Sequence, residues 1–278
     1  MAGVDLHTHS NCSDGVLSPR DLVARAAGRG VRMLALTDHD TVDGLAEARA
    51  AASGHGMTFV TGTELSARYD EQVVHVVGLG IDPAAGRLRE GLGRQQALRE
   101  TRAVEIGRKL AKLGCDVADR ARALAGQGQP TRTHYARALL RAGHVREPQE
   151  AFDRYLGRGR PAYVRADWAV LDEAVAWITD SGGVAVLAHP ARYKMSARQR
   201  RGLIAAFQAA GGKGIEVVTG NVSRDDLFRF ADLARQHGLM ASLGSDFHDP
   251  AETWIEIGRL PDLPPGLTPI WQNGFHAP

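Results

Sequence analysis

The first fourteen residues combine two histidines and an acid at a spacing that suits metal binding. His7 and His9 follow the apolar residues 4–6, and Asp14 lies in the loop beyond them. Side chains two positions apart on a β-strand point to the same face, so both imidazoles could reach one cation. An isolated His-x-His pair can equally be a surface feature, and the rest of the chain decides between the two interpretations.

Histidines and acids recur where short apolar runs end. These runs are rich in aliphatic and β-branched residues and predict seven strands, at residues 4–6, 33–36, 58–61, 73–77, 184–187, 215–218 and 239–243. Singly, His75 could be a core histidine and Glu64 a helix cap. Together, nine imidazoles and carboxylates accompany these strands: His7, His9, Asp14, His39, Glu64, His75, His189, Asp246 and His248. Such a set is large enough for two or three cations.

Helical patterns separate most of the strands. They span residues 19–30, 42–54, 170–182, 197–210 and 224–238, and four of them follow a hydroxyl residue that could cap the helix: Ser18, Thr41, Ser196 and Ser223. Alternating strands and helices predict a parallel α/β fold, in which polar residues at the strand ends meet at one mouth of a closed or nearly closed barrel. The link between Glu64 and the next strand is too short for a helix, so we expect an irregularity there.

A helical stretch interrupts this alternation. Residues 94–163 contain helical patterns at 95–113, 116–125, 133–142 and 148–156 with no strand between them. We therefore expect a barrel domain at residues 1–93 and 164–278 and an inserted helical module at 94–163, called the insert below. The proline-rich tail, 261–278, is expected to pack as irregular chain on the outside of the barrel.

Composition excludes several classes of protein. The chain has 278 residues, 34 Lys and Arg against 32 Asp and Glu, and a net charge of +2, which does not suggest a dedicated duplex-DNA binder. Two distant cysteines predict neither a disulfide framework nor a thiolate zinc site. The start of the chain lacks the features of a signal peptide, and no apolar run is long enough to span a membrane, so we expect a cytoplasmic protein with no membrane partner.

The polar strand ends resemble, in order, the motifs of the polymerase and histidinol phosphatase (PHP) family of metallophosphoesterases. The matching segments are His7-Thr8-His9, Thr37-Asp38-His39-Asp40, Gly62-Thr63-Glu64, His75, Ala188-His189-Pro190 and Ser245-Asp246-Phe247-His248. The resemblance implies a distorted (β/α)7 barrel with a trinuclear site. It assigns a first metal to His7, His9, Glu64 and Asp246, a second to Glu64, His75 and His189, and a third to Asp14, His39 and His248.

This resemblance also implies a chemistry. Glu64 would bridge two metals, with Asp246 and His189 as further catalytic residues and water as the nucleophile. Imidazole and carboxylate ligands suit two or three divalent cations, with Mn²⁺ expected and Fe²⁺ or Zn²⁺ as alternatives. Asp38 and Asp40, on either side of His39, are expected to orient ligands rather than to bind metal directly.

The insert resembles that of the bacterial branch of the family that acts as 3′,5′-nucleoside bisphosphate phosphatase and as 5′-to-3′ exoribonuclease on short RNA. By this resemblance the insert lies over the barrel mouth, where Arg132, His134 and Arg137 would hold substrate phosphate. Tyr193, Lys194 and Asn221 are further candidate substrate contacts. The four tryptophans, Trp168, Trp177, Trp254 and Trp271, are expected to be packing residues rather than platforms for bases.

Two alternatives stay open at this stage. A histidinol-phosphate phosphatase or a DNA-trimming exonuclease of the same family would keep the metal ligands without needing the cations of the insert. A non-catalytic barrel that binds nucleic acid or serves as a structural module is the alternative of another class. The expected partners are a nucleotide substrate and short RNA, and no obligate protein partner is evident.

Overall fold

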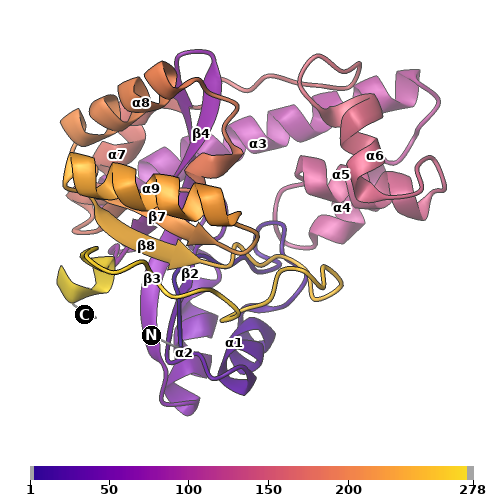
Figure 1. Cartoon of the computed structure of the whole chain (residues 1–278). Helices are drawn as coiled ribbons and strands as arrows, with labels where there is room; N and C mark the ends of the chain where they lie inside the picture. Colours follow the sequence, from indigo (N-terminus) through magenta and orange to yellow (C-terminus); the bar gives the residue numbers. More distant parts are fainter. Residues whose placement is uncertain (1–2, 274–278) are drawn as a thin grey trace.

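The computed structural model describes residues 3–273 and shows an α/β barrel whose parallel strands end on the side of the insert (Figure 1). The sheet order is β1-β2-β3-β4-β6-β7-β8, with β5 beside β3. The strands are β1 (Val4–Asp5), β2 (Met33–Leu36), β3 (Thr58–Tyr69), β4 (Gln72–Leu79), β5 (Ala169–Val170), β6 (Val184–Leu187), β7 (Gly214–Thr219) and β8 (Met240–Gly244). All seven predicted strands are present, and β5 is additional.

Backbone hydrogen bonds bring the two edges of the sheet together. The amide of Leu6 donates to Leu243 O at 3.1 Å, and the amide of Asp246 donates to His7 O at 2.8 Å. Gly244 permits this close approach, because a Cβ at that position would lie 2.2 Å from His7 Cβ. The result is a nearly closed seven-strand barrel, as predicted.

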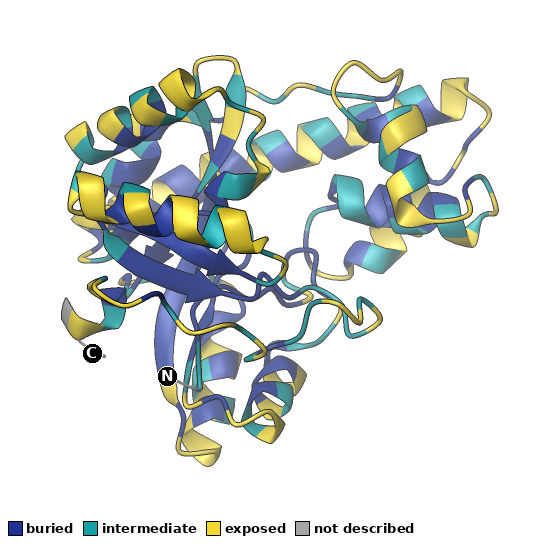
Figure 2. Cartoon of the chain, in the orientation of Figure 1, coloured by how far each residue is buried: buried dark blue, intermediate teal, exposed yellow. Residues whose placement is uncertain are grey.

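Helices cover the outside of the barrel and bury their apolar faces against it (Figure 2). They are α1 (Pro19–Gly28), α2 (Leu45–Gly54), α7 (Leu171–Asp180), α8 (Ala197–Ala209) and α9 (Arg224–His237). Ser18, Ser196 and Ser223 accept the expected capping bonds. The predicted cap at Thr41 is wrong: α2 begins only after Gly44, and the Thr41 hydroxyl instead accepts a hydrogen bond from Asp43 N within the preceding turn.

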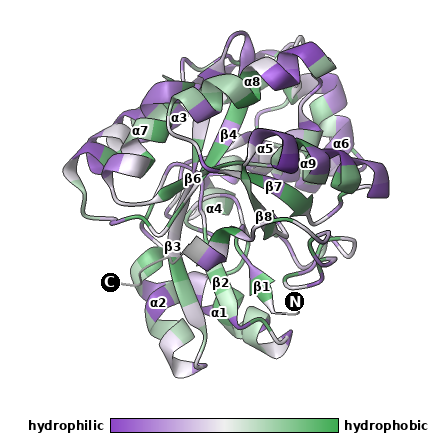
Figure 3. Cartoon of the chain, turned by 60° about the vertical axis from the view of Figure 1, so that its left-hand side comes forward, coloured by the Kyte–Doolittle hydropathy of each residue, from purple (hydrophilic) through white to green (hydrophobic). Residues whose placement is uncertain are grey.

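The expected irregularity is an antiparallel hairpin. β4 runs antiparallel to both β3 and β6, so the chain turns back at the barrel mouth without a helix and β4 leads away from it. β3 is also longer than predicted, which places Glu64 in the interior of a strand rather than beyond its end. Figure 3 shows the apolar strands inside and the more polar helices around them.

The insert forms a second hydrophobic cluster. Its elements are α3 (Gly86–Lys112), α4 (Ala118–Ala125), α5 (Arg132–Arg141) and α6 (Pro148–Ala151), which continues as a π-helical turn, Phe152–Leu156. Leu88 and Leu92 of α3 pack in the barrel cluster, whereas Ile106 and Leu110 pack in the cluster of the insert. The proposed division at residues 94 and 163 encloses this second cluster, although α3 itself runs across the boundary.

The tail contributes to the barrel interior. Pro269 forms a bridge with Ala241, and Ile270 is buried with Leu6 and Val186. This corrects the expectation that the tail lies wholly outside the barrel. The last residues of the predicted tail, 274–278, lie outside the described part. Along residues 3–273, no helix has the length and apolar character needed to cross a membrane.

Candidate metal centre

The structure brings all nine predicted ligands together at the mouth of the barrel; they are called the histidine–carboxylate cluster below. Ligand atoms lie within 4.8 Å of one another in each of three groups: His7, His9, Glu64 and Asp246; His9, Asp14, His39 and His248; and His39, Glu64 and His75. The first group coincides with the set expected for one cation. The others share most members with the sets expected for two more cations.

Glu64 lies at the centre of the cluster. Its Oε1 is 2.8 Å from His189 Nε2 and 2.9 Å from His75 Nδ1, and its Oε2 is 2.8 Å from His39 Nδ1. The side chain is 1% exposed. A carboxylate with both oxygens directed at imidazoles is arranged as a bridge between two cations would be.

Neighbouring strands position the first histidines. Thr8, between His7 and His9, donates its hydroxyl to Ala35 O of β2 at 2.7 Å, and Thr37 N donates to Thr8 O at 2.9 Å. The Nε2 atoms of His7 and His9 lie 3.0 Å apart, so the two rings converge as the spacing predicts.

Asp38 supports the loop that carries Asp14. It accepts hydrogen bonds from the amide and hydroxyl of Ser10 and from the hydroxyl of Ser13, at 2.6 to 2.7 Å. Asp40 is engaged elsewhere, by Arg99 of α3 and by Ser66 N. Asp38 therefore takes a supporting position close to the one expected, whereas the carboxylate of Asp40 holds α3 and β3 and forms no hydrogen bond with a cluster member within residues 3–273.

Electrostatics and unmatched polar atoms fit a cation. Burial alone would raise the pKa of Glu64, but the facing His39, His75 and His7 together hold it well below its usual range. The buried oxygens Asp14 Oδ1 and Glu64 Oε2 form no hydrogen bond with any described residue. Imidazole nitrogens face these oxygens at 2.8 to 3.2 Å without hydrogen-bond geometry, an arrangement that a divalent cation between the ligands would satisfy.

The sequence reasoning missed Glu216, which supports two cluster members. Its Oε1 lies 2.8 Å from His7 Nδ1, and its Oε2 accepts a hydrogen bond from the amide of His189. His189 has a φ of 27°, and Asp246 has a φ of 54°. Such backbone conformations are unfavourable for residues other than glycine and persist where the surroundings enforce them. An acid inside the apolar run 215–218 was the available signal.

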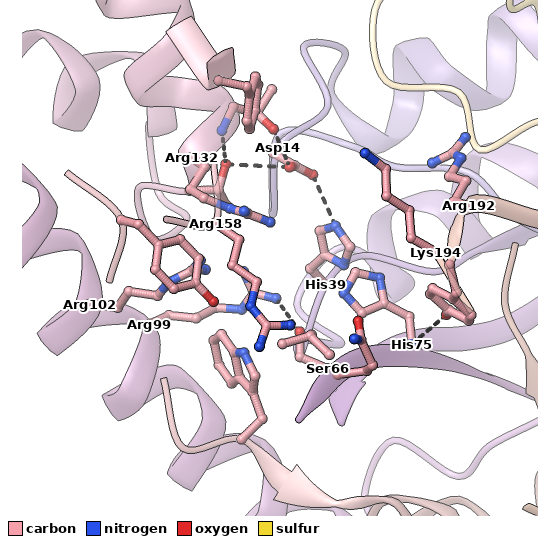
Figure 4. Close-up of a pocket in the computed structure, with 18 of the residues that line it drawn as sticks. Asp14, His39, Ser66, His75, Arg99, Arg102, Arg132, Arg158, Arg192 and Lys194 are labelled. Atoms are coloured by element: carbon pink, nitrogen blue, oxygen red, sulfur yellow. Dashed lines mark hydrogen bonds and ion pairs between the residues drawn. The ribbon is translucent and has the colours of Figure 1, made fainter. Parts of the chain in front are cut away.

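A cavity of about 600 Å³ opens beside the cluster, between the barrel and the insert (Figure 4). Asp14, His39 and His75 of the cluster reach its wall. Arg102 of α3 and Arg132 of α5 also line it, over the rings of Trp168 and Phe152 respectively. No carboxylate among residues 3–273 forms an ion pair with either guanidinium. Burial, with neighbouring arginines, lowers the pKa of Arg102 to about 9 and also lowers that of Arg132.

The predicted substrate contacts divide into two sets. Arg132, Tyr193 and Lys194 line the cavity, and Arg132 lies between Thr131 and Thr133, whose hydroxyls donate to Asp14 Oδ2 at 3.4 and 3.1 Å. The Tyr193 hydroxyl is already engaged, since it accepts from His75 N and donates to Ala188 O.

His134, Arg137 and Asn221 are not in the described lining of the cavity. His134 is buried, accepts a hydrogen bond from Thr131 N, and has its pKa lowered to about 4 by burial. Arg137 donates to Asp14 O at 3.0 Å and pairs with Asp249 at 3.3 Å. Asn221 is exposed in the turn after β7.

Fold and cluster together define a barrel protein whose buried histidines and carboxylates suit a polynuclear divalent-metal site. The model of the PHP domain family matches residues 5–219. A 3′,5′-nucleoside bisphosphate phosphatase of Chromobacterium violaceum is 47% identical over 275 residues, covering 98% of this chain and 96% of that protein. The chain therefore belongs to the PHP domain family.

Two further comparisons agree over nearly the whole length. A 5′-3′ exoribonuclease of Haemophilus influenzae is 46% identical, and the match covers 97% of this chain and 98% of that protein. The solved structure of an amidohydrolase from Chromobacterium violaceum, with bound sulfate and no metal, has a TM-score of 0.94 at 46% identity and covers 98% of this chain and 95% of that chain. The insert is thus part of the shared fold.

Proposed function

We propose that the chain is a metal-dependent phosphoesterase that hydrolyses the 3′-phosphate of nucleoside 3′,5′-bisphosphates and trims short RNA from its 5′ end. The observation that carries the proposal is the cavity: one wall holds members of the histidine–carboxylate cluster, and another holds Arg102 and Arg132, which form no ion pair with a carboxylate of residues 3–273. Its volume of about 600 Å³ falls within the range of small-molecule sites. The relatives named above are a nucleoside bisphosphate phosphatase and an exoribonuclease.

The cluster would hold two or three cations, and Mn²⁺ is our first choice among Mn²⁺, Fe²⁺ and Zn²⁺. One would take His7, His9, Glu64 and Asp246; another Glu64, His75 and His189; the third Asp14, His39 and His248. Bound divalent cations activate water at neutral pH and neutralise the charge of a phosphoryl group.

The protein itself supplies charge and orientation for the rest of the substrate. With the 3′-phosphate at the cluster, the second phosphate of a bisphosphate needs its own cations, and Arg102 and Arg132 are unpaired arginines in the same cavity. Lys194 is exposed at the cavity wall and adds a further positive charge. In the reaction, a water oxygen bonds to phosphorus, the P–O3′ bond breaks, and the 3′ oxygen takes up a proton.

The test is phosphate release from adenosine 3′,5′-bisphosphate by chelator-treated protein resupplied with Mn²⁺. Glu64→Gln should lower kcat by roughly 100-fold or more, because it removes the central carboxylate charge of the cluster. Arg132→Ala should raise KM by about 10-fold, because a charged phosphate contact is lost. Arg141→Ala, an exposed position on the same helix, is the matched control.

Two results would contradict the proposal. Turnover of histidinol phosphate with none of the bisphosphate would retain the metal centre and reject the substrate. Release that persists in chelator, or in Glu64→Gln, would reject the cluster as the catalytic site.

A further inference from the structure

The cavity occupies only part of the barrel mouth. Its lining comes from the loops after β1 and β2, from the β3–β4 hairpin, from the insert, from Trp168 just before β5 and from residues 192–194 after β6. No residue of β7, β8 or the loops that follow them belongs to the described lining. Asp246 and His248 of the cluster nevertheless come from this other side, so the cluster separates the cavity from a second rim.

The second rim is built from two loops that pack against each other. A Cβ on Gly220, after β7, would lie 2.2 Å from Ser245 O and 3.0 Å from Ile255 Cγ2, so the loops after β7 and β8 are in direct contact. Helix α9 leaves this rim and lies against the 3₁₀ turn Pro190–Arg192, which directly follows His189. The rim thus adjoins the cluster.

Two exposed aromatic side chains stand on this rim. Trp254, in the loop after β8, is 60% exposed, and Phe228, in the second turn of α9, is 48% exposed. They are the only strongly exposed large aromatic residues of the described chain. The expectation that Trp254 is a packing residue is therefore wrong, whereas Trp168 and Trp177 are buried and Trp271 packs against the barrel cluster as predicted.

Two arginines accompany these aromatics, on a rim that also carries the acids Asp225 and Glu252. Arg224 is exposed, lies over the Phe228 ring at 5.8 Å, and has no ion pair with any residue of 3–273. Arg192 is 47% exposed and pairs with Asp246, between the rim and the cavity. The carboxylate of the nearby Asp226 accepts hydrogen bonds from the Ser223 hydroxyl and from Arg229. Exposed aromatic rings beside arginines are the elements with which proteins hold single-stranded nucleic acid.

We propose that Trp254 and Phe228 form a stacking platform for the RNA nucleotides downstream of the cleaved bond. This inference rests on the proposed function. With the 5′-terminal nucleotide in the cavity and its 3′-phosphodiester at the cluster, the next nucleoside is attached to the same phosphorus through another oxygen. The downstream strand then continues past the cluster and over the second rim. Hydrolysis breaks P–O3′, so the downstream strand keeps the phosphate as its new 5′ end.

The experiment compares two substrates: adenosine 3′,5′-bisphosphate, which does not reach the rim, and a 5′-phosphorylated tetraribonucleotide, which does. In the Trp254→Ala/Phe228→Ala variant, kcat/KM for the tetranucleotide should fall about 10-fold or more, because base stacking is lost. Turnover of the bisphosphate should stay unchanged. A variant with Phe at position 254 in place of Ala (Trp254→Phe/Phe228→Ala) should regain most of the lost kcat/KM for the tetranucleotide, because it keeps an aromatic ring there. Val104→Ala, at an exposed apolar position on α3, is the control for loss of an exposed apolar side chain.

A binding measurement gives an independent readout. A tetranucleotide with 2-aminopurine at its second position, mixed with protein in chelator, should lose fluorescence by stacking on the wild type and less so on the double variant.

The outcomes of these experiments distinguish a failure of the stacking platform from a failure of the proposed function. Unchanged tetranucleotide kinetics in the double variant, or an equal loss on both substrates, would overturn the platform. A changed oligomeric state with unchanged RNA kinetics would mean that the rim binds another copy of the chain, and would also overturn it. Failure of the wild type on both substrates would instead reject the proposed function.

Discussion

Glu216 shows how one buried carboxylate can support a metal centre without joining it. The side chain is 1% exposed, it faces His7 Nδ1, and it accepts the amide hydrogen of His189. A carboxylate at one imidazole nitrogen fixes the ring so that the other nitrogen faces the metal. Glu216 is therefore a positioning residue.

We predict that Glu216→Gln lowers the affinity for Mn²⁺ by about 10- to 100-fold, because the neutral glutamine side chain polarises His7 less and has one acceptor oxygen for two donors, His7 Nδ1 and His189 N. Calorimetric titration of chelator-treated protein with Mn²⁺ measures this directly, with circular dichroism to verify folding. Glu105→Gln, an exposed acid on α3, serves as control. An affinity equal to that of the wild type would show that Glu216 has no positioning role.

Among individual residues, the sequence predicted the members of the histidine–carboxylate cluster well and the residues that line the cavity poorly. The nine cluster positions are recognisable because strand ends must converge in a parallel barrel. Whether His134 and Arg137 face the cavity could not be predicted in this way. Only the packing of α5 reveals that His134 faces Thr131 and that Arg137 faces Asp14 and Asp249. Arg102 was missed because it lies mid-helix among many arginines.

A buried ion pair joins the barrel to helix α3. Arg99 donates to Asp40 Oδ2 at 2.7 Å and to the Ser66 hydroxyl at 3.0 Å, and it lies over the Trp168 ring. The side chain of Asp40 is fully buried and that of Arg99 is 9% exposed. Removing one partner would leave a buried charge uncompensated.

Arg99→Met should therefore lower the free energy of unfolding by about 3 to 5 kcal/mol, and the double variant Arg99→Met/Asp40→Asn should recover a large part of that loss. Urea unfolding measures both. Arg108→Met, which breaks an exposed pair with Glu105, should cost no more than about 1 kcal/mol. Equal losses in the Arg99 and Arg108 variants would show that burial of the first pair has no special effect.

Element boundaries were predictable wherever local signals act alone. Ser18, Ser196 and Ser223 cap the expected helices, whereas Thr41 does not, because the chain first passes Asp40 with a φ of 52° and then a turn. The length of β3 was underestimated because its second half pairs with β4 as a hairpin, and the hairpin partner extends a strand beyond its own apolar run.

For the molecule as a whole, Glu256 ties the loop after β8 to α1. It accepts hydrogen bonds from Arg25 at 2.7 and 2.9 Å and from Arg29 at 2.8 Å. Burial alone would raise the pKa of Glu256, but these arginines hold it below its ordinary value of 4.5. A lowered pKa stabilises the fold above pH 4.5 and loses that effect as the pH falls through the folded-state value.

We therefore predict that Glu256→Gln lowers the free energy of unfolding near neutral pH by about 1 kcal/mol, and that its difference from the wild type shrinks as the pH is taken below 4.5. Urea unfolding at several pH values measures the trend. A difference that stays constant through this range would contradict the assignment of the effect to the ionised carboxylate.

Helix α3 links the barrel rigidly to the insert. With 27 residues it is about 40 Å long, and its first turns pack in one hydrophobic cluster while its last turns pack in the other. Because α5 is also fastened to Asp14 through Thr131, Thr133 and Arg137, the insert is braced at two points. We therefore expect the insert to stay fixed relative to the barrel, so that substrate exchange would not require a hinge motion of the roof of the cavity.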